Sequence, residues 1–70
     1  MIAQADRRGT IVKIDDGYVV VKDEAGEWYN LRPHLQVSTG VVREVGAPVK
    51  LRWVSGPSWG WWAAIHPDEG

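Results

Sequence analysis

Short apolar or alternating runs, separated by turn residues, follow one another along this 70-residue chain. Five runs have the pattern of strands: residues 9–14, 18–23, 27–31, 49–54 and 61–65. Period-two alternation and β-branched residues suit the half-buried surface of a sheet. The first three runs are separated by two short loops that contain glycine, and such loops join antiparallel neighbours. The first half of the chain is therefore predicted to form a three-stranded meander.

The second half of the chain begins with a longer connection, residues 32–46, that lacks a strand pattern. Pro33-His34-Leu35-Gln36 predicts one short helical turn within it. In the run that follows, Val49, Leu51 and Trp53 alternate with Lys50, Arg52 and Val54, which predicts that Trp53 points into the core. The loop before Trp61 and the final run then complete a closing hairpin.

Gly and Pro recur so often that no stretch lacking both exceeds eight residues, at 1–8 and 18–25. Packed helices of about 10–14 residues do not fit between them. The sequence therefore predicts an all-β fold, a small five-stranded antiparallel barrel, because closure removes sheet edges that so short a chain protects poorly. The expected organisation is an N-terminal arm (1–8), a single five-stranded barrel (9–66) and a C-terminal tail (67–70).

The order of meander, long connection and hairpin is that of the oligonucleotide/oligosaccharide-binding barrel, the OB-fold. A Src-homology-type small barrel is the structural rival. The chain has no cysteine, which removes disulfides and thiolate metal ligands and agrees with a cytoplasmic location. No apolar run approaches the ~20 residues of a membrane span, so no membrane association is expected.

Charge is distributed unevenly along the chain. The net charge is −1, which argues against a strongly basic nucleic-acid binder. From Trp28 to His66, however, four positive residues face one negative residue, whereas the first 27 residues carry four positive and six negative ones. A locally positive surface is therefore compatible with the composition.

Several segments resemble the bacterial cold-shock domain. Residues 8–12 resemble its opening strand, residues 16–21 lie where that family has its first ribonucleoprotein motif, and residues 28–36 lie where it has its second. Residues 46–53 resemble its Gly-x-x-Val-x-Phe-x-Ile strand, and Ala63-Ala64-Ile65 resembles its ending. The related RNA-binding barrel of ribosomal proteins fits the first half comparably.

This sequence departs from the cold-shock pattern in its aromatic residues. In the first motif Tyr18 is retained, and Val20 stands where the second Phe would be. The second motif keeps Trp28 and Tyr29 but lacks its His and second Phe. The final hairpin, in contrast, carries additional tryptophans.

The resemblance implies binding of single-stranded RNA or DNA by base stacking and phosphate contacts, with weak sequence preference. The candidate binding residues are the cations Lys13, Arg32 and Arg52 and the aromatics Tyr18, Trp28, Tyr29, Trp59 and Trp61. Each exposed aromatic face can stack a base, and each cation can meet a phosphate. A one-residue shift in strand register exchanges the two faces of a strand, so which of Trp28 and Tyr29 is exposed stays open.

The sequence was also compared with what a protein-interaction module and an enzyme require. A protein-interaction module or small regulator would use the Trp-rich final hairpin as a docking or homodimer surface, since Trp and Arg are favoured interface anchors. Catalysis is not expected. His34 and His66 lie far apart without metal-ligand spacing, and Asp15-Asp16 fits a turn. No metal site, cofactor or enzymatic activity is therefore predicted.

Overall fold

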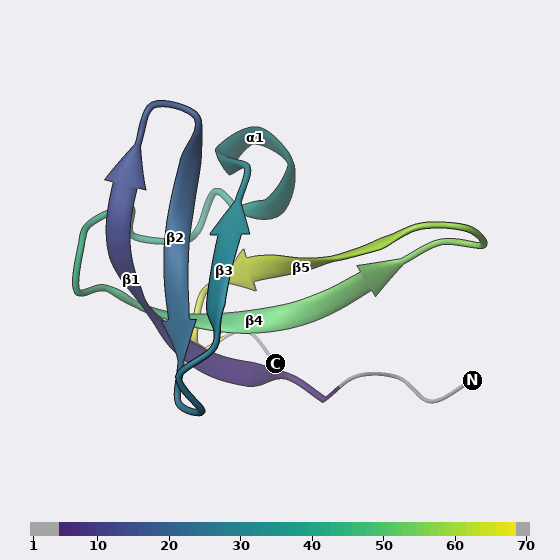
Figure 1. Cartoon of the computed structure of the whole chain (residues 1–70), viewed down its shortest axis with the longest axis horizontal. Helices are drawn as coiled ribbons and strands as arrows, with labels where there is room; N and C mark the ends of the chain where they lie inside the picture. The colour runs from purple at the N-terminus through teal and green to yellow at the C-terminus, as the bar shows by residue number, and fades with distance from the viewer. Residues whose placement is uncertain (1–4, 69–70) are drawn as a thin grey trace.

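The computed structural model describes residues 5–68 and contains five strands and one helical turn in that range. The elements are β1 (Arg7–Asp15), β2 (Tyr18–Asp23), β3 (Trp28–Leu31), α1 (Pro33–Gln36), β4 (Pro48–Ser55) and β5 (Gly60–Ile65). All strands pair antiparallel, in the order β3-β2-β1-β4-β5, and form one sheet curled into a half-barrel (Figure 1). The all-β class, the five strands and the helical turn at Pro33–Gln36 are thus confirmed.

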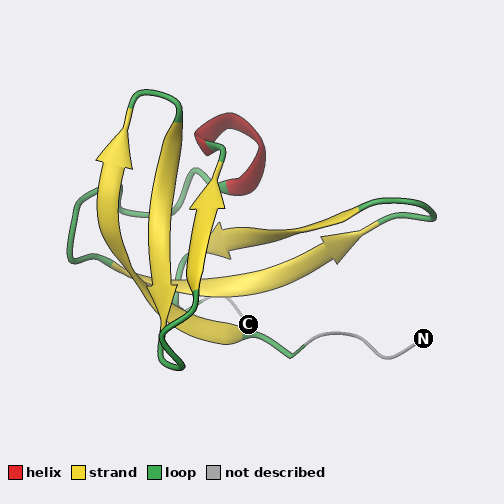
Figure 2. Ribbon diagram, in the orientation of Figure 1, coloured by secondary structure: helices red, strands yellow, loops and turns green. Residues whose placement is uncertain are grey.

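The two end strands of the sheet, β3 and β5, face each other across a seam that the connection after β3 covers. Figure 2 shows the helical turn beside this seam. The Gln36 side-chain amide donates to the Trp62 carbonyl at 2.9 Å. Val37 forms a parallel bridge with Ala64, and the Ser38 N–H donates to the Ala64 carbonyl at 2.9 Å. The connection therefore satisfies the free edge of β5, and within residues 5–68 the ladder does not close from β3 to β5.

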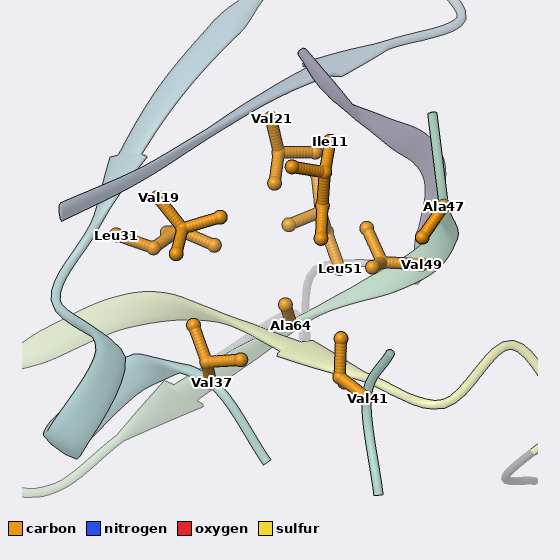
Figure 3. Packing of buried hydrophobic residues seen from close by; sticks show 10 residues of the cluster. All are labelled: Ile11, Val19, Val21, Leu31, Val37, Val41, Ala47, Val49, Leu51 and Ala64. Carbon is orange, nitrogen blue, oxygen red and sulfur yellow. The ribbon is translucent and has the colours of Figure 1, made fainter. Parts of the chain in front are cut away.

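The core is a cluster of aliphatic side chains on the inner face of the sheet (Figure 3). Its members are Ile11, Val19, Val21, Leu31, Val37, Val41, Ala47, Val49, Leu51 and Ala64. Residues directly opposite in an antiparallel pair share a face, and the pairs Ile11–Val21 and Val19–Leu31 follow this rule. The inner face is thereby identified, and the alternate residues of each strand lie on the outer face.

A β-bulge in β1 changes which side chains face outward. Ile11 pairs with Val21, but Lys13, two residues further, pairs with Val20, so Val12 is the extra residue. Without the bulge, Lys13 would share the inner face with Ile11, because side chains alternate. The extra residue places Lys13 on the outer face.

Trp53 corrects one expectation. It lies on the inner face, where its partner is Trp62, yet it remains 36% exposed and the prediction that it is buried is wrong. The Trp53–Trp62 pair comes one inner-face step beyond Leu51–Ala64, where the β4–β5 hairpin extends past the rest of the sheet (Figure 1). Aliphatic residues fill the core instead.

The turn between β1 and β2 forms where it was expected, by a different mechanism. Asp16-Gly17 is a common hairpin sequence, in which the glycine usually has a positive φ. Among residues 5–68, positive φ occurs at Gly26 (88°) and Gly46 (95°), not at Gly17. The Asp15 carboxylate accepts a hydrogen bond from the Asp16 N–H at 2.9 Å, which supports the turn role predicted for these aspartates.

Candidate functional site

The outer face of β1, β2 and β3 gathers aromatic and cationic side chains. The ladder pairs Lys22 with Trp28, Val20 with Asn30, and Lys13 with Val20. These pairs alternate with the buried ones, so they lie on the outer face. We call this surface the platform, and its residues are Lys13, Tyr18, Val20, Lys22, Trp28 and Asn30.

Trp28 is the most exposed aromatic of the platform, with 62% of its surface accessible. The Lys22 ammonium lies 5.3 Å from its ring centroid, within cation–π range. The register question for β3 is thereby answered: Trp28 faces outward, and Tyr29 shares the inner face with its partner Val21. The platform thus presents an open aromatic ring with a cation beside it.

A groove of about 610 Å³ adjoins the platform at the turn between β1 and β2. Its lining residues are Asp16, Gly17, Tyr18, Asn30, Arg32, Pro33, His34 and Leu35. This volume falls in the range of about 300–1,000 Å³ that is usual for small-molecule sites. The groove combines the ring of Tyr18 with the amide of Asn30 and the guanidinium of Arg32. It therefore places an aromatic ring beside a hydrogen-bonding amide and a positive charge.

Tyr29 takes part in a hydrogen-bond network on the inner side of the sheet. Its hydroxyl donates to the Asp23 carboxylate at 2.6 Å and accepts from the Arg7 guanidinium at 2.6 Å. Asp23 is 7% exposed and also accepts from the N–H groups of Ala25 and Glu27, both at 2.9 Å. The hydroxyl of Tyr29 is thus engaged within the fold, apart from the platform.

The same network shifts three ionisations. The hydrogen bond from Tyr29 lowers the pKa of Asp23 against the opposing effect of desolvation. Burial, followed by the bond to Asp23, raises the pKa of Tyr29. The bond to Tyr29 raises the pKa of Arg7, whose guanidinium also lies 4.6 Å from the ring centroid of Trp62. Folding therefore favours an ionised Asp23, a neutral Tyr29 and a charged Arg7.

The remaining candidates, Arg52, Trp59 and Trp61, lie on the β4–β5 hairpin. Arg52 pairs with Ala63 and Trp61 with Val54, which places Arg52 and Trp61 on the outer face. Trp59 stacks on Trp61 with centroids 4.5 Å apart and an interplanar angle of 19°, and it is 48% exposed. The Arg52 guanidinium donates two hydrogen bonds to the Asp6 carboxylate, at 3.0 and 3.3 Å. The eight candidates therefore divide between the platform with its groove, the inner network and the hairpin.

Two glycines make room for tryptophan rings in this hairpin. A Cβ atom on Gly60 would lie 2.4 Å from Cζ2 of Trp53, and one on Gly56 would lie 2.4 Å from Cε2 of Trp59. We expect Gly60→Ala to displace the Trp53 ring from its edge contact with Trp62 and to cost about 1 kcal/mol of stability. Near-ultraviolet circular dichroism detects the displacement, because it reports on packed tryptophans.

Gly17→Ala is the matched control for that substitution, because a Cβ atom there meets nothing within 4 Å. A Gly60→Ala spectrum that is superimposable on those of the wild type and of Gly17→Ala would show that the ring does not depend on the glycine.

The sequence prediction missed part of the platform and groove. Lys22 alternates with period two with Tyr18 and Val20, so the sequence alone could have placed it among the candidate binding residues. Asn30 and Leu35 carry no such signal, because they join the groove only through the pairing of β3 with β2 and the position of α1.

Within residues 5–68 no group of three or more His, Asp or Glu side chains has the arrangement of a metal site. None of the described helices is long and apolar enough to cross a membrane. The chain matches no family model, no curated protein and no solved structure.

Proposed function

We propose that the chain binds single-stranded RNA or DNA on the platform and in the adjoining groove. The observation that carries the proposal is the strand register, which collects Trp28, Tyr18 and the cations of β1 and β2 on one outer face. We further propose that the half-barrel is an OB-fold related to the cold-shock domain. Its strand order and the helical turn after β3 support this assignment.

Base stacking supplies the main attraction in this proposal. A base stacked on an aromatic side chain contributes roughly 1–3 kcal/mol and requires no particular sequence. Trp28 offers an open ring face, and Tyr18 offers a second one at the groove. The Asn30 amide beside Tyr18 can donate to and accept from a base edge, which gives a modest preference.

Cations around these rings bind the phosphates. Lys22 lies over the ring of Trp28, the β-bulge places Lys13 on the same outer face, and Arg32 lines the groove. Lys13 has an exposed carboxylate, Asp15, at 3.8 Å, and exposed pairs of this kind cost little to open. The two oxygens of Asp23 are engaged in the inner network, so this nearby acid repels a strand less than its charge suggests.

The first test is the binding of a dye-labelled four-nucleotide oligopyrimidine, followed by fluorescence anisotropy. We expect saturable binding at low salt that weakens as salt rises, because phosphate contacts release counterions. Trp28→Ala is expected to weaken binding by about fivefold or more, which corresponds to the loss of one stacked base. Tyr18→Ala is expected to weaken it similarly.

Arg43→Gln is the matched control, because it removes a positive charge from a residue of the connection between α1 and β4 that belongs neither to the platform nor to the groove lining. Its guanidinium donates long hydrogen bonds, both 3.5 Å, to the carbonyls of Pro33 and Val37, so circular dichroism checks that this variant keeps the fold. No binding at low salt, or equal affinities for wild type and Trp28→Ala, would contradict the proposal. The Trp59–Trp61 pair, of which Trp59 is exposed, would then become the lead for the alternative function, docking of a protein.

A further inference from the structure

A second group of cations crosses the outer face of the sheet from β2 to β4. Thr10 lies opposite Lys22 on one side and opposite Pro48 on the other, and Arg8 lies opposite Lys50. These pairs alternate with the inward pair Gly9–Val49 and are therefore outward. Arg52 is the next outward residue of β4 after Lys50. We call Lys22, Arg8, Lys50 and Arg52 the cationic track.

A hollow of about 270 Å³ lies in the middle of this track. Its lining residues are Arg8, Gly9, Thr10, Lys22, Asp23, Glu24, Pro48, Val49, Lys50 and Pro67. Three cations from three different strands thus surround one depression. Ammonium and guanidinium groups both bind phosphate oxygens, so a wall to which three such residues contribute suits a phosphate.

Acidic groups also lie near the track and limit its strength. Two acids, Asp23 and Glu24, line the hollow against three cations, and the Asp23 carboxylate is held in the inner network. Asp6 binds Arg52 and acts electrostatically on Lys50. Salt and a competing phosphate screen exposed pairs of this kind. The lining therefore keeps an excess of one positive charge, three cations against two acids, and Arg52 contributes less than the other cations of the track.

Aromatic rings stand at both ends of the track. At one end Lys22 lies against Trp28 of the platform. At the other end Arg52 is followed along the outer face of the hairpin by Val54 and its partner Trp61, on which Trp59 stacks. The hairpin projects away from β1–β3 (Figure 1), and Trp59 is exposed while Trp61 is half-buried.

We propose that the cationic track carries the sugar–phosphate backbone of one strand from the platform to a second stacking site on the Trp59–Trp61 pair. The inference rests on the proposed function and extends it to a substrate class: single strands long enough to reach both aromatic sites. A stacked tryptophan pair alone suits a protein as well as a base. Its continuity with a row of cations favours a polyanion.

The dimensions define the length of strand that is required. From β3 to β5 the sheet has four inter-strand steps of about 4.8 Å, so a strand must cover at least about 19 Å across the outer face. OB-folds bind about 4–16 nucleotides each. We therefore compare a four-nucleotide strand, at the lower end of this range, with a twelve-nucleotide strand, which is long enough to occupy the platform and the hairpin together. Engagement of both sites by one strand raises affinity through effective concentration.

The experiment compares dye-labelled four- and twelve-nucleotide oligothymidylates with the wild-type chain and two variants. We expect the wild type to bind the twelve-mer at least about tenfold more tightly than the four-mer. Trp59→Ala should lose about fivefold or more on the twelve-mer and less than about twofold on the four-mer. The double variant Arg8→Gln/Lys50→Gln should lower the salt slope on the twelve-mer by about 1.4, since each phosphate contact on a single strand contributes about 0.7.

Arg43→Gln serves as the matched charge control, and circular dichroism confirms that each variant is folded. If the four-mer binds but the twelve-mer binds no more tightly and Trp59→Ala changes neither affinity, the track is overturned while the platform stands. If Trp59→Ala weakens both oligomers equally, the hairpin is the primary site and the two-site path is wrong. Absence of binding to either oligomer rejects both proposals.

Discussion

Leu51→Ala is expected to lower the free energy of unfolding by about 3 kcal/mol or more. Leu51 is 0% exposed and belongs to the aliphatic core, where its loss removes apolar burial and leaves a cavity. A chain of 70 residues has a total stability of roughly 3.5–10 kcal/mol. One substitution in β4 therefore removes about 30% or more of the stability. Urea denaturation followed by tryptophan fluorescence measures the loss.

Leu35→Ala is the matched control, because it deletes the same atoms from a side chain that is 57% exposed on the helical turn. Its effect is expected to stay within about 0.5 kcal/mol, as for most surface substitutions. Equal shifts of the two urea midpoints would mean that the aliphatic cluster is not the main source of stability.

The sequence predicted those parts of the fold that local chemistry determines. Strand Tyr18–Asp23 and the helical turn Pro33–Gln36 begin and end as expected. Each element is bounded by a turn or by proline, and the residues that determine its conformation lie within the element itself or next to it. The other four strands lie within two residues of their expected ends. Such local signals do not depend on how the sheet curls.

Features that depend on pairing between residues on different strands were harder to predict from the sequence. The bulge at Val12 is a feature of the pairing between β1 and β2, where Ile11 lies opposite Val21 and Lys13 lies opposite Val20. It places the Lys13 side chain on the outer face of the sheet. The choice between Trp28 and Tyr29 likewise follows from the register with β2. The alternation in β4 correctly predicted that Trp53 lies on the inner face. It did not predict that the hairpin extends beyond the core at that position, which leaves Trp53 exposed.

The candidate site shows the same division. Tyr18, Trp28 and Lys13 come together on the platform because three consecutive strands are neighbours, as the meander predicted. Arg52 and Trp61 were also binding candidates, and the structure places them on the hairpin at the other end of the sheet. The cationic track reconnects the two groups through Arg8, which pairs β1 with β4. Sequence alternation alone does not show that pairing.

The network of Asp23, Tyr29 and Arg7 supports both regions, since it joins the turn after β2 to the hairpin. Asp23 binds the turn N–H groups and the hydroxyl of Tyr29, whose ring packs edge-on against Trp62 at 5.9 Å. Arg7 bridges Tyr29 and the ring of Trp62. Loss of this network is therefore expected to loosen β3 and β5 together.

Acid and alkali are expected to destabilise the fold through different members of this network. The pKa of Asp23 lies below its ordinary value of 3.8, so folding favours the carboxylate. Its contribution is complete above pH 3.8 and is lost as pH falls through the folded-state value. The pKa of Tyr29 lies above 10.0, so folding favours the neutral phenol. That contribution is complete below pH 10 and is lost as pH rises through the folded-state value.

Urea midpoints measured from about pH 2 to pH 11 separate the two contributions. Asp23→Asn is expected to lower stability at neutral pH and to flatten the acid limb, because the variant has no carboxylate to protonate. Tyr29→Phe is expected to flatten the alkaline limb, since phenylalanine does not ionise, and also to weaken the acid limb, because it removes the largest cause of the lowered Asp23 pKa. The acid limb is not lost completely, because Asp23 keeps its two backbone donors and Arg7 at 3.8 Å. Asp6→Asn is the matched control for the acid limb. The pKa of Asp6 is also lowered, by its hydrogen bond to Arg52, but the pair is exposed and salt screens it. An acid limb that Asp6→Asn flattens more than Asp23→Asn would place the pH sensitivity at the base of the hairpin rather than in the inner network.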